Sequence, residues 1–171
     1  MERIEEKEVQ LMLWIQQNIR NKILNIFNVI ITIFGEALLY WIVAGFLIFG
    51  PFGLKELGIK LLVTIILEAL IVHVLLKRKV NRERPFNKYK EIKALGRIPR
   101  DKSWPSGHTA MSFSFAILLL LEFPFETGWL AILFATLIAF SRIYLGVHYP
   151  TDVVGGFIVA IIIKFLVLLI L

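Results

Sequence analysis

The sequence predicts an all-α fold, a polytopic bundle of membrane helices, and three observations support this. Hydrophobic residues make up 58% of the 171 residues, and the mean hydropathy is +0.77. This apolar share exceeds that of typical soluble domains. Several apolar segments approach the length of about 20 residues that a helix needs to cross a bilayer. The charged residues, in contrast, gather in a few short stretches between these segments.

Five segments are long and apolar enough to be expected as transmembrane helices. They are residues 35–50, 57–76, 106–122, 127–146 and 151–171. Residues 4–30 instead alternate apolar with charged and amide side chains, which favours an amphipathic helix lying in the membrane interface. A sixth span over residues 9–34 is the alternative, although Arg20 and Lys22 would then lie near the middle of the membrane. The expected division is an N-terminal interfacial segment, 1–34, and a membrane-embedded domain, 35–171.

The net charge of +6 is unevenly distributed. Residues 77–102 contain eleven Lys/Arg and three Asp/Glu. Such a basic run is typical of a solvated loop or a nucleic-acid patch. Because no soluble binding domain surrounds it, we expect contact with a membrane surface or with phosphate, and no nucleic-acid partner. Cysteine is absent, which excludes disulfides, thiolate metal sites and cysteine nucleophiles.

Three polar islands lie at the ends of the expected spans. They are residues 77–85 (KRKVNRERP), 105–108 (PSGH) and 141–152 (SRIYLGVHYPTD). With five spans, all three islands reach the same face of the membrane. Ionisable groups at a membrane edge are costly and by default indicate function. Phosphoryl transfer needs cationic donors, a nucleophile and an acid for the leaving group, and the islands contain all three.

The first two islands supply groups that bind oxyanions. Lys77 and Arg84 are seven residues apart, about two helical turns, so both could face one pocket. Ser106 can cap a helix or donate its hydroxyl, and the backbone N–H groups of Gly107 and His108 at the helix start favour an anion. His108 could protonate a leaving oxygen.

The third island supplies a further cation and a histidine–carboxylate pair. Arg142 adds a guanidinium fork. His148 and Asp152 are four residues apart, and a carboxylate on one imidazole nitrogen leaves the other free to attack. From these residues alone, either His108 or His148 could be the nucleophile, although the adjacent carboxylate favours His148. Singly, each island is more often structural: PSGH is a capped helix start, the His–Asp pair is an ordinary hydrogen bond, and the Lys/Arg run is a solvated loop. The three together favour a phosphate site.

The pattern Lys77-x6-Arg84-Pro85, Pro105-Ser106-Gly107-His108 and Ser141-Arg142-x5-His148-x3-Asp152 resembles the three signature motifs of the type 2 phosphatidic acid phosphatase superfamily. The resemblance covers roughly residues 35–171. It implies hydrolysis of a lipid phosphate or pyrophosphate without metal or other cofactor.

The resemblance also implies a role for each motif residue. His148 would be the nucleophile that forms a phosphohistidine, Asp152 would orient it, and His108 would be the general acid. The residues expected to hold the phosphate are Lys77, Arg84, Ser106, Gly107 and Arg142. The substrate would be a bacterial envelope lipid, with undecaprenyl pyrophosphate, phosphatidylglycerophosphate and lipid A 1-phosphate as candidates. The sequence does not predict an oligomeric state.

The two indications of membrane sidedness conflict. The positive-inside rule would place the basic residues 77–102 in the cytoplasm. The resemblance implies an active site on the outer (periplasmic or extracellular) face of the inner (plasma) membrane. We follow the resemblance, because a phosphate site gives these charges a competing reason to be there.

Two functions of other classes are the alternatives. A vanadium haloperoxidase-like oxidoreductase would share the pocket, but five apolar spans argue against it. A non-catalytic lipid-phosphate binder would not need a nucleophile. Three further polar residues have a functional and a simpler interpretation. Glu36 could tune His148 or meet a substrate amine, but a helix-start carboxylate is at least as good an interpretation. Glu68 could relay protons and His73 could be a third catalytic histidine, but a structural hydrogen bond and a packed helix histidine are the simpler interpretations.

Overall fold

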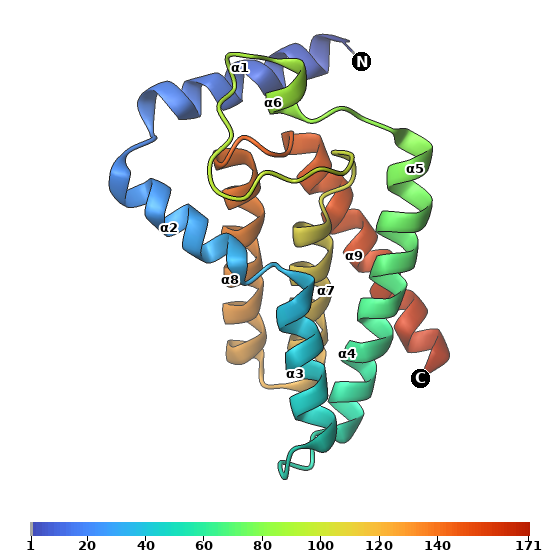
Figure 1. The fold of residues 1–171 in the computed structure, drawn as a ribbon. Helices are drawn as coiled ribbons and strands as arrows, with labels where there is room; N and C mark the ends of the chain where they lie inside the picture. The colour runs from blue at the N-terminus through green and yellow to red at the C-terminus, as the bar shows by residue number, and fades with distance from the viewer. Residues whose placement is uncertain (1) are drawn as a thin grey trace.

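The computed structural model describes residues 2–171, and every regular element in this range is helical, which confirms the all-α class (Figure 1). The helices are, in chain order, α1 (Glu2–Asn18), α2 (Lys22–Ile33), α3 (Ala37–Phe49), α4 (Lys55–Glu68), the π-helix η1 (Ala69–Leu76), α5 (Lys77–Val80), α6 (Pro85–Lys88), α7 (Gly107–Glu122), α8 (Phe125–Tyr144) and α9 (Pro150–Ile170).

The described residues contain three candidate membrane spans, or four if a bent helix pair counts as one. Three helical stretches in the described range are long and apolar enough to cross a membrane: Lys55–Lys88, Phe125–Tyr144 and Pro150–Ile170. The pair α2 and α3 meet at 47° and would count as a fourth span if taken together. Helix α7 is apolar but has only 16 residues. The predicted count of five spans is therefore not confirmed, whereas a multi-pass membrane bundle is.

The segment expected as one amphipathic helix is divided into α1 and α2. Asn21 begins α2, and its side-chain Oδ1 accepts a hydrogen bond from the Leu24 N–H at 2.9 Å. Arg20 fixes the break, because its Nη2 donates to the Tyr144 carbonyl at 2.6 Å. Polar side chains that prefer caps and turns thus stop the first helix where periodicity alone would continue it.

Helix α1 lies across the end of the bundle at which α8 ends and α9 begins (Figure 1). Its inner face buries Met12 and Ile15, which belong to apolar clusters with Tyr149 and Tyr144 respectively. Trp14 on another face is 53% exposed. One side of α1 therefore packs on the protein while another remains free for the interface.

Helix α7 occupies the centre of the bundle, against α4, α8 and α9. Small residues let the helices approach closely, and the buried cluster of Ala116, Ala135, Ala139 and Ala160 joins α7, α8 and α9. The longer connection 89–106 covers the end of the bundle that α1 crosses (Figure 1). The short connections 50–54 and 123–124 lie at the opposite end. This arrangement brings the three polar islands together, as predicted.

Candidate active site

A cavity of about 920 Å³ lies where the polar islands meet. Six of the eight predicted site residues line it: Lys77, Arg84, Gly107, His108, Arg142 and His148. The remaining two, Ser106 and Asp152, are fully buried behind this lining.

His148 and Asp152 form a buried pair at the junction of α8 and α9. The ring Nδ1 of His148 lies 3.3 Å from Oδ2 of Asp152, and the ring Nε2 lies 3.1 Å from Nη1 of Arg84. A carboxylate can only accept and a guanidinium can only donate. These partners therefore select the tautomer with the proton on Nδ1, which leaves the Nε2 lone pair directed toward the cations.

Arg84 and Lys77 form the cationic wall of the pocket, and both side chains are almost completely buried. Arg84 is held by the Val147 carbonyl at 2.7 Å from Nη1 and by the Asp101 carbonyl at 2.7 Å from Nε. Lys77 donates from Nζ to the Asp101 carboxylate. The fixed backbone contacts of Arg84 preorganise its fork for an anion.

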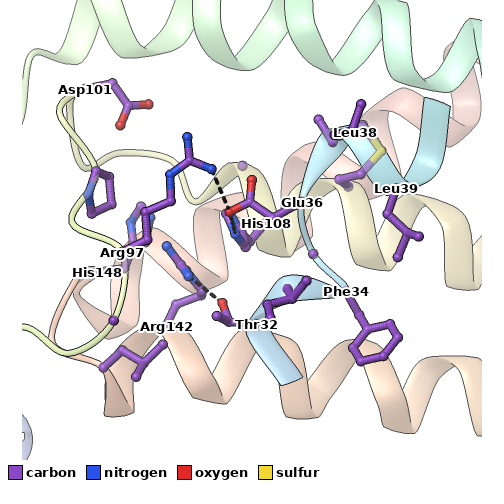
Figure 2. Close-up of a pocket in the computed structure, with 18 of the residues that line it drawn as sticks. Thr32, Phe34, Glu36, Leu38, Leu39, Arg97, Asp101, His108, Arg142 and His148 are labelled. Atoms are coloured by element: carbon purple, nitrogen blue, oxygen red, sulfur yellow. Dashed lines mark hydrogen bonds and ion pairs between the residues drawn. The ribbon is translucent and has the colours of Figure 1, made fainter. Parts of the chain in front are cut away.

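Arg142 projects from the last turn of α8 into the same cavity, as Figure 2 shows. Its Nη1 donates to the hydroxyl of Thr32 on α2, while its Nε is buried without a hydrogen-bond partner among residues 2–171. A buried guanidinium N–H without a partner is costly. Arg142 is thus able to donate to a ligand in this cavity.

His108 lies across the cavity from His148 and faces Glu36 (Figure 2). The His108 Nε2 is 3.5 Å from Oε1 of Glu36, which also approaches Nη1 of Arg97 at 3.4 Å. The sequence suggested that Glu36 could tune His148, but the structure places it beside His108. Gly35 makes room for this ring, because a Cβ there would come within 2.8 Å of Cδ2 of His108.

Ser106 is the N-cap of α7, and its Oγ accepts a hydrogen bond from the Thr109 hydroxyl at 2.9 Å. Its backbone N–H donates to the Asp152 carbonyl at 3.0 Å, which ties α7 to α9. Gly107 has little room for a side chain, since a Cβ would lie 3.2 Å from Oε1 of Glu68. A direct contact of Ser106 with substrate stays a prediction, whereas its capping role is visible.

Asp101 is the site residue that the sequence reasoning missed. Its side chain is 43% exposed, and its Oδ1 accepts from Nη2 of Arg84 at 2.6 Å while Oδ2 accepts from Lys77. His73 Nδ1 lies 3.8 Å from the same carboxylate, and His73 Nε2 lies 3.8 Å from Glu68. Asp101 is one of three acids among the basic residues 77–102, and no periodicity or motif singles it out.

The ionisation of the two loop residues follows from their surroundings. Burial lowers the pKa of His148 well below its ordinary value, and the nearby charges of Arg84 and Arg142 lower it further. Burial alone would raise the pKa of Asp101, but the hydrogen bonds and charges of Lys77 and Arg84 outweigh this and hold it well below its usual range. These surroundings therefore favour the neutral form of His148 and the ionised form of Asp101.

Known proteins resemble this chain in both sequence and fold. The sequence profile of the PAP2 superfamily matches residues 57–171. The undecaprenyl-diphosphatase of Sulfolobus acidocaldarius is 35% identical over 112 residues, which cover 66% of this chain and 54% of that protein. The chain thus spans about half the length of this relative.

Two solved structures superpose closely on this fold. LpxE of Aquifex aeolicus has a TM-score of 0.81 and 30% identity, with 93% of each chain covered. A transmembrane PAP2-type phosphatidylglycerolphosphate phosphatase from Bacillus subtilis has a TM-score of 0.77 and 27% identity, with 99% of this chain and 87% of that chain covered. With the family profile matching two thirds of the chain, this protein belongs to the PAP2 superfamily.

Proposed function

We propose that this protein hydrolyses the phosphate ester or pyrophosphate bond of a membrane lipid through a phosphohistidine on His148. One observation carries the proposal. The Nε2 of the buried His148 faces a cavity whose inner part is lined by the cations Lys77, Arg84 and Arg142, while Nδ1 is fixed by Asp152. A pocket that only bound phosphate would not need a nucleophilic lone pair directed at the anion.

In the first step, Nε2 of His148 attacks phosphorus. The bond from phosphorus to the leaving oxygen breaks, and its electron pair stays with that oxygen, which takes a proton from His108. The positive charge that develops on the imidazole is stabilised by Asp152. The Arg84 N–H that donates to Nε2 in the free protein then donates to a phosphate oxygen.

In the second step, water attacks the phosphohistidine and gives a proton to the now neutral His108. The N–P electron pair returns to Nε2, and inorganic phosphate leaves. The two histidines thus have different partners for different tasks. Asp152 is fully buried, so it orients and stabilises the imidazole without exchanging protons with water, whereas the Glu36 side chain is 36% exposed and can support a protonated His108 that does exchange them.

The apolar side of the cavity supports a lipid substrate that approaches laterally. Residues at the bend between α2 and α3 line it, namely Ile33, Phe34, Leu38, Leu39 and Ile42. Leu38 is 70% exposed and Ile42 is 61% exposed. Because these side chains face the bilayer in a membrane protein, the lipid tail can stay among them while the phosphate enters between the cations.

Two arginines of the basic residues 77–102 support a diphosphate as the first substrate to test. Arg97 and Arg100 line the same cavity beyond the three inner cations, where a second phosphate would lie. The relative from Sulfolobus acidocaldarius is an undecaprenyl-diphosphatase, whereas the relative from Bacillus subtilis acts on phosphatidylglycerolphosphate. An undecaprenyl pyrophosphate is therefore the leading candidate, ahead of phosphatidylglycerophosphate and lipid A 1-phosphate. We place the site on the outer face of the plasma membrane.

The deciding experiment is a phosphate-release panel on the purified protein in detergent. It compares the three lipids with a water-soluble phosphate ester that has no tail. We expect release from the lipids, highest for the diphosphate, and poor release from the tailless ester. Halide oxidation with vanadate, or binding of lipid without phosphate release, would replace the proposal by one of the alternative functions. Equal catalytic efficiency on the tailless ester would exclude lateral access.

A further inference from the structure

Glu8 of α1 is an acid buried to all but 6%, although α1 lies at the edge of the protein. Its Oε2 accepts a hydrogen bond from Nη2 of Arg82 at 2.8 Å. Its Oε1 accepts from the backbone N–H of Thr151 at 2.6 Å and from the Thr151 hydroxyl at 2.7 Å. A buried carboxylate is stable only when it is paired and hydrogen-bonded, and Glu8 uses both oxygens for this.

Arg82 continues from Glu8 to the first turn of α9. Its Nη1 donates to Oδ1 of Asp152 at 2.7 Å and to the Thr151 hydroxyl at 2.7 Å. Its guanidinium lies 3.8 Å from the centre of the Tyr149 ring, which covers one face of the planar group. With the Glu8 contact, the fork has little freedom to turn.

The two oxygens of Asp152 are divided between different tasks. Oδ2 accepts from the Tyr149 backbone N–H at 2.8 Å, accepts from the Ser103 hydroxyl and faces Nδ1 of His148. Among the described residues, Oδ1 has a side-chain hydrogen bond to Arg82 alone. Arg82 therefore fixes the rotation of the carboxylate plane, and with it the direction in which Oδ2 meets the imidazole.

We propose that Glu8 and Arg82 are positioning residues for the reaction, so that α1 is part of the catalytic apparatus as well as a membrane-facing helix. The inference rests on the proposed roles of His148 and Asp152. Charge alternates along this relay: Glu8 is negative, Arg82 positive and Asp152 negative. Neither Glu8 nor Arg82 lines the substrate cavity, so each acts through Asp152.

The alternation of charge predicts opposite effects on the acid limb of kcat/KM. His148 is surrounded by Asp152 of α9, Arg84 before α6, Lys77 of α5, His108 of α7 and Arg142 of α8. Arg82→Gln leaves the negative charge of Asp152 less compensated, which favours the imidazolium, so the pKa of His148 rises and the limb moves to higher pH. Glu8→Gln leaves Arg82 less compensated, so the limb moves to lower pH. A merely structural role would not produce shifts of opposite sign.

The test uses the full chain in detergent with the variants Arg82→Gln, Arg82→Lys and Glu8→Gln. Glu5→Gln is the matched control, because Glu5 also joins α1 to the basic loop, at 2.6 Å from Lys88 Nζ and 2.9 Å from the Tyr89 hydroxyl, but does not reach Asp152. Phosphate release against pH gives kcat and KM, and the melting temperature with and without orthovanadate reports folding and an intact pocket.

We expect Arg82→Gln to lower kcat about 10- to 100-fold with little change in KM, the scale on which outer partners of functional side chains act. Arg82→Lys keeps the positive charge but loses the forked guanidinium. Its acid limb should therefore lie at the wild-type position, while its kcat should lie between those of Arg82→Gln and the wild type. Glu5→Gln should match the wild type in both respects.

Failure of the relay is distinguishable from failure of the proposed function. Normal kcat and an unmoved acid limb in Arg82→Gln and Glu8→Gln, together with an inactive His148→Ala, would overturn the relay alone. A loss of kcat in which the acid limb stays unmoved in both variants, or moves in the same direction in both, would assign the pair a structural role. This result would also overturn the relay. Substantial activity in His148→Ala would instead overturn the proposed function. If Arg82→Gln does not fold, Glu8→Gln and Arg82→Lys carry the same comparison.

Discussion

The carboxylate of Asp101 binds Arg84, with Oδ1 lying 2.6 Å from Nη2, and the other oxygen binds Lys77. The two cations expected to hold the substrate phosphate thus hold an anion from their own chain. A substrate must displace this carboxylate or share the cations with it. The unusually low pKa of Asp101 follows from the same contacts, which outweigh the effect of burial.

Asp101→Asn should therefore tighten the binding of orthovanadate, by about tenfold or 1.4 kcal/mol, because the amide competes less well for two cations. Vanadate inhibition of phosphate release measures this. Glu91→Gln is the control, since Glu91 is an exposed acid of the same connection and should leave inhibition unchanged. Weaker vanadate binding in Asp101→Asn would mean that the carboxylate organises the cations for the substrate.

The pH dependence of the reaction should reflect the lowered pKa of His148. The attacking imidazole must be neutral, and burial with the nearby Arg84 and Arg142 keeps it neutral below its ordinary value of about 6.5. The acid limb of kcat/KM should thus lie below this value. An acid limb above pH 7 would contradict the assignment.

The same shift has a consequence for stability. A group whose folded-state pKa is depressed contributes stability that is present above its unfolded pKa and is lost as pH falls. His148 should therefore contribute to a decrease in melting temperature below about pH 6.5. The variant His148→Gln lacks this titration, and its melting temperature should fall less over the same interval.

His148→Ala should abolish phosphate release while orthovanadate still stabilises the protein, because the cations remain. The loss should be on the order of 10⁴-fold or more, as for other nucleophile–histidine systems. Asp152→Asn should be less severe, since it removes orientation rather than the attacking atom. Residual hydrolysis by His148→Ala near the Asp152→Asn level would refute the nucleophile assignment.

Chelation should leave activity largely intact. Lys77, Arg84 and Arg142 already supply positive charge around the phosphate position, which is the task that metal ions perform in two-metal phosphatases. Phosphate release after extensive dialysis against EDTA measures this. Activity that disappears on dialysis and returns with Mg²⁺ or Zn²⁺ would change the mechanism.

The sidedness of the site is open to a labelling experiment, since the chain has no cysteine. A cysteine at Lys93, an exposed position in the connection above the site, should react with an impermeant reagent added to intact cells. A cysteine at Lys55, at the opposite end of the bundle where α4 begins, serves as the control and should react only after lysis. The reverse pattern would restore the topology expected from the positive charges.

The motif residues were predictable because their chemistry and spacing are specific. Lys77, His108 and His148 lie far apart in the sequence, yet each occurs at the end of an apolar segment, so the segment lengths alone brought them to one face. The contacts that organise them were not predictable. Glu8 is one of several acids in a charged helix, and it is buried on the same side of α1 as Met12 and Ile15, where Arg82 and Thr151 meet it. The division between α1 and α2 likewise depends on a distant partner, because the Tyr144 carbonyl holds Arg20.

The contact of Glu8 with Thr151 joins residues that are 143 positions apart. During synthesis, α1 is made before α9, so the Glu8 carboxylate can meet Arg82 midway through the chain but meets Thr151 only after the beginning of α9 has been made. A ribosome-bound chain that lacks α9 therefore contains the cations proposed to bind phosphate but lacks Asp152, the residue proposed to orient the imidazole. Phosphate release should then begin only when the start of α9 has docked on α1. Its onset can be used to time the last step of folding in the membrane.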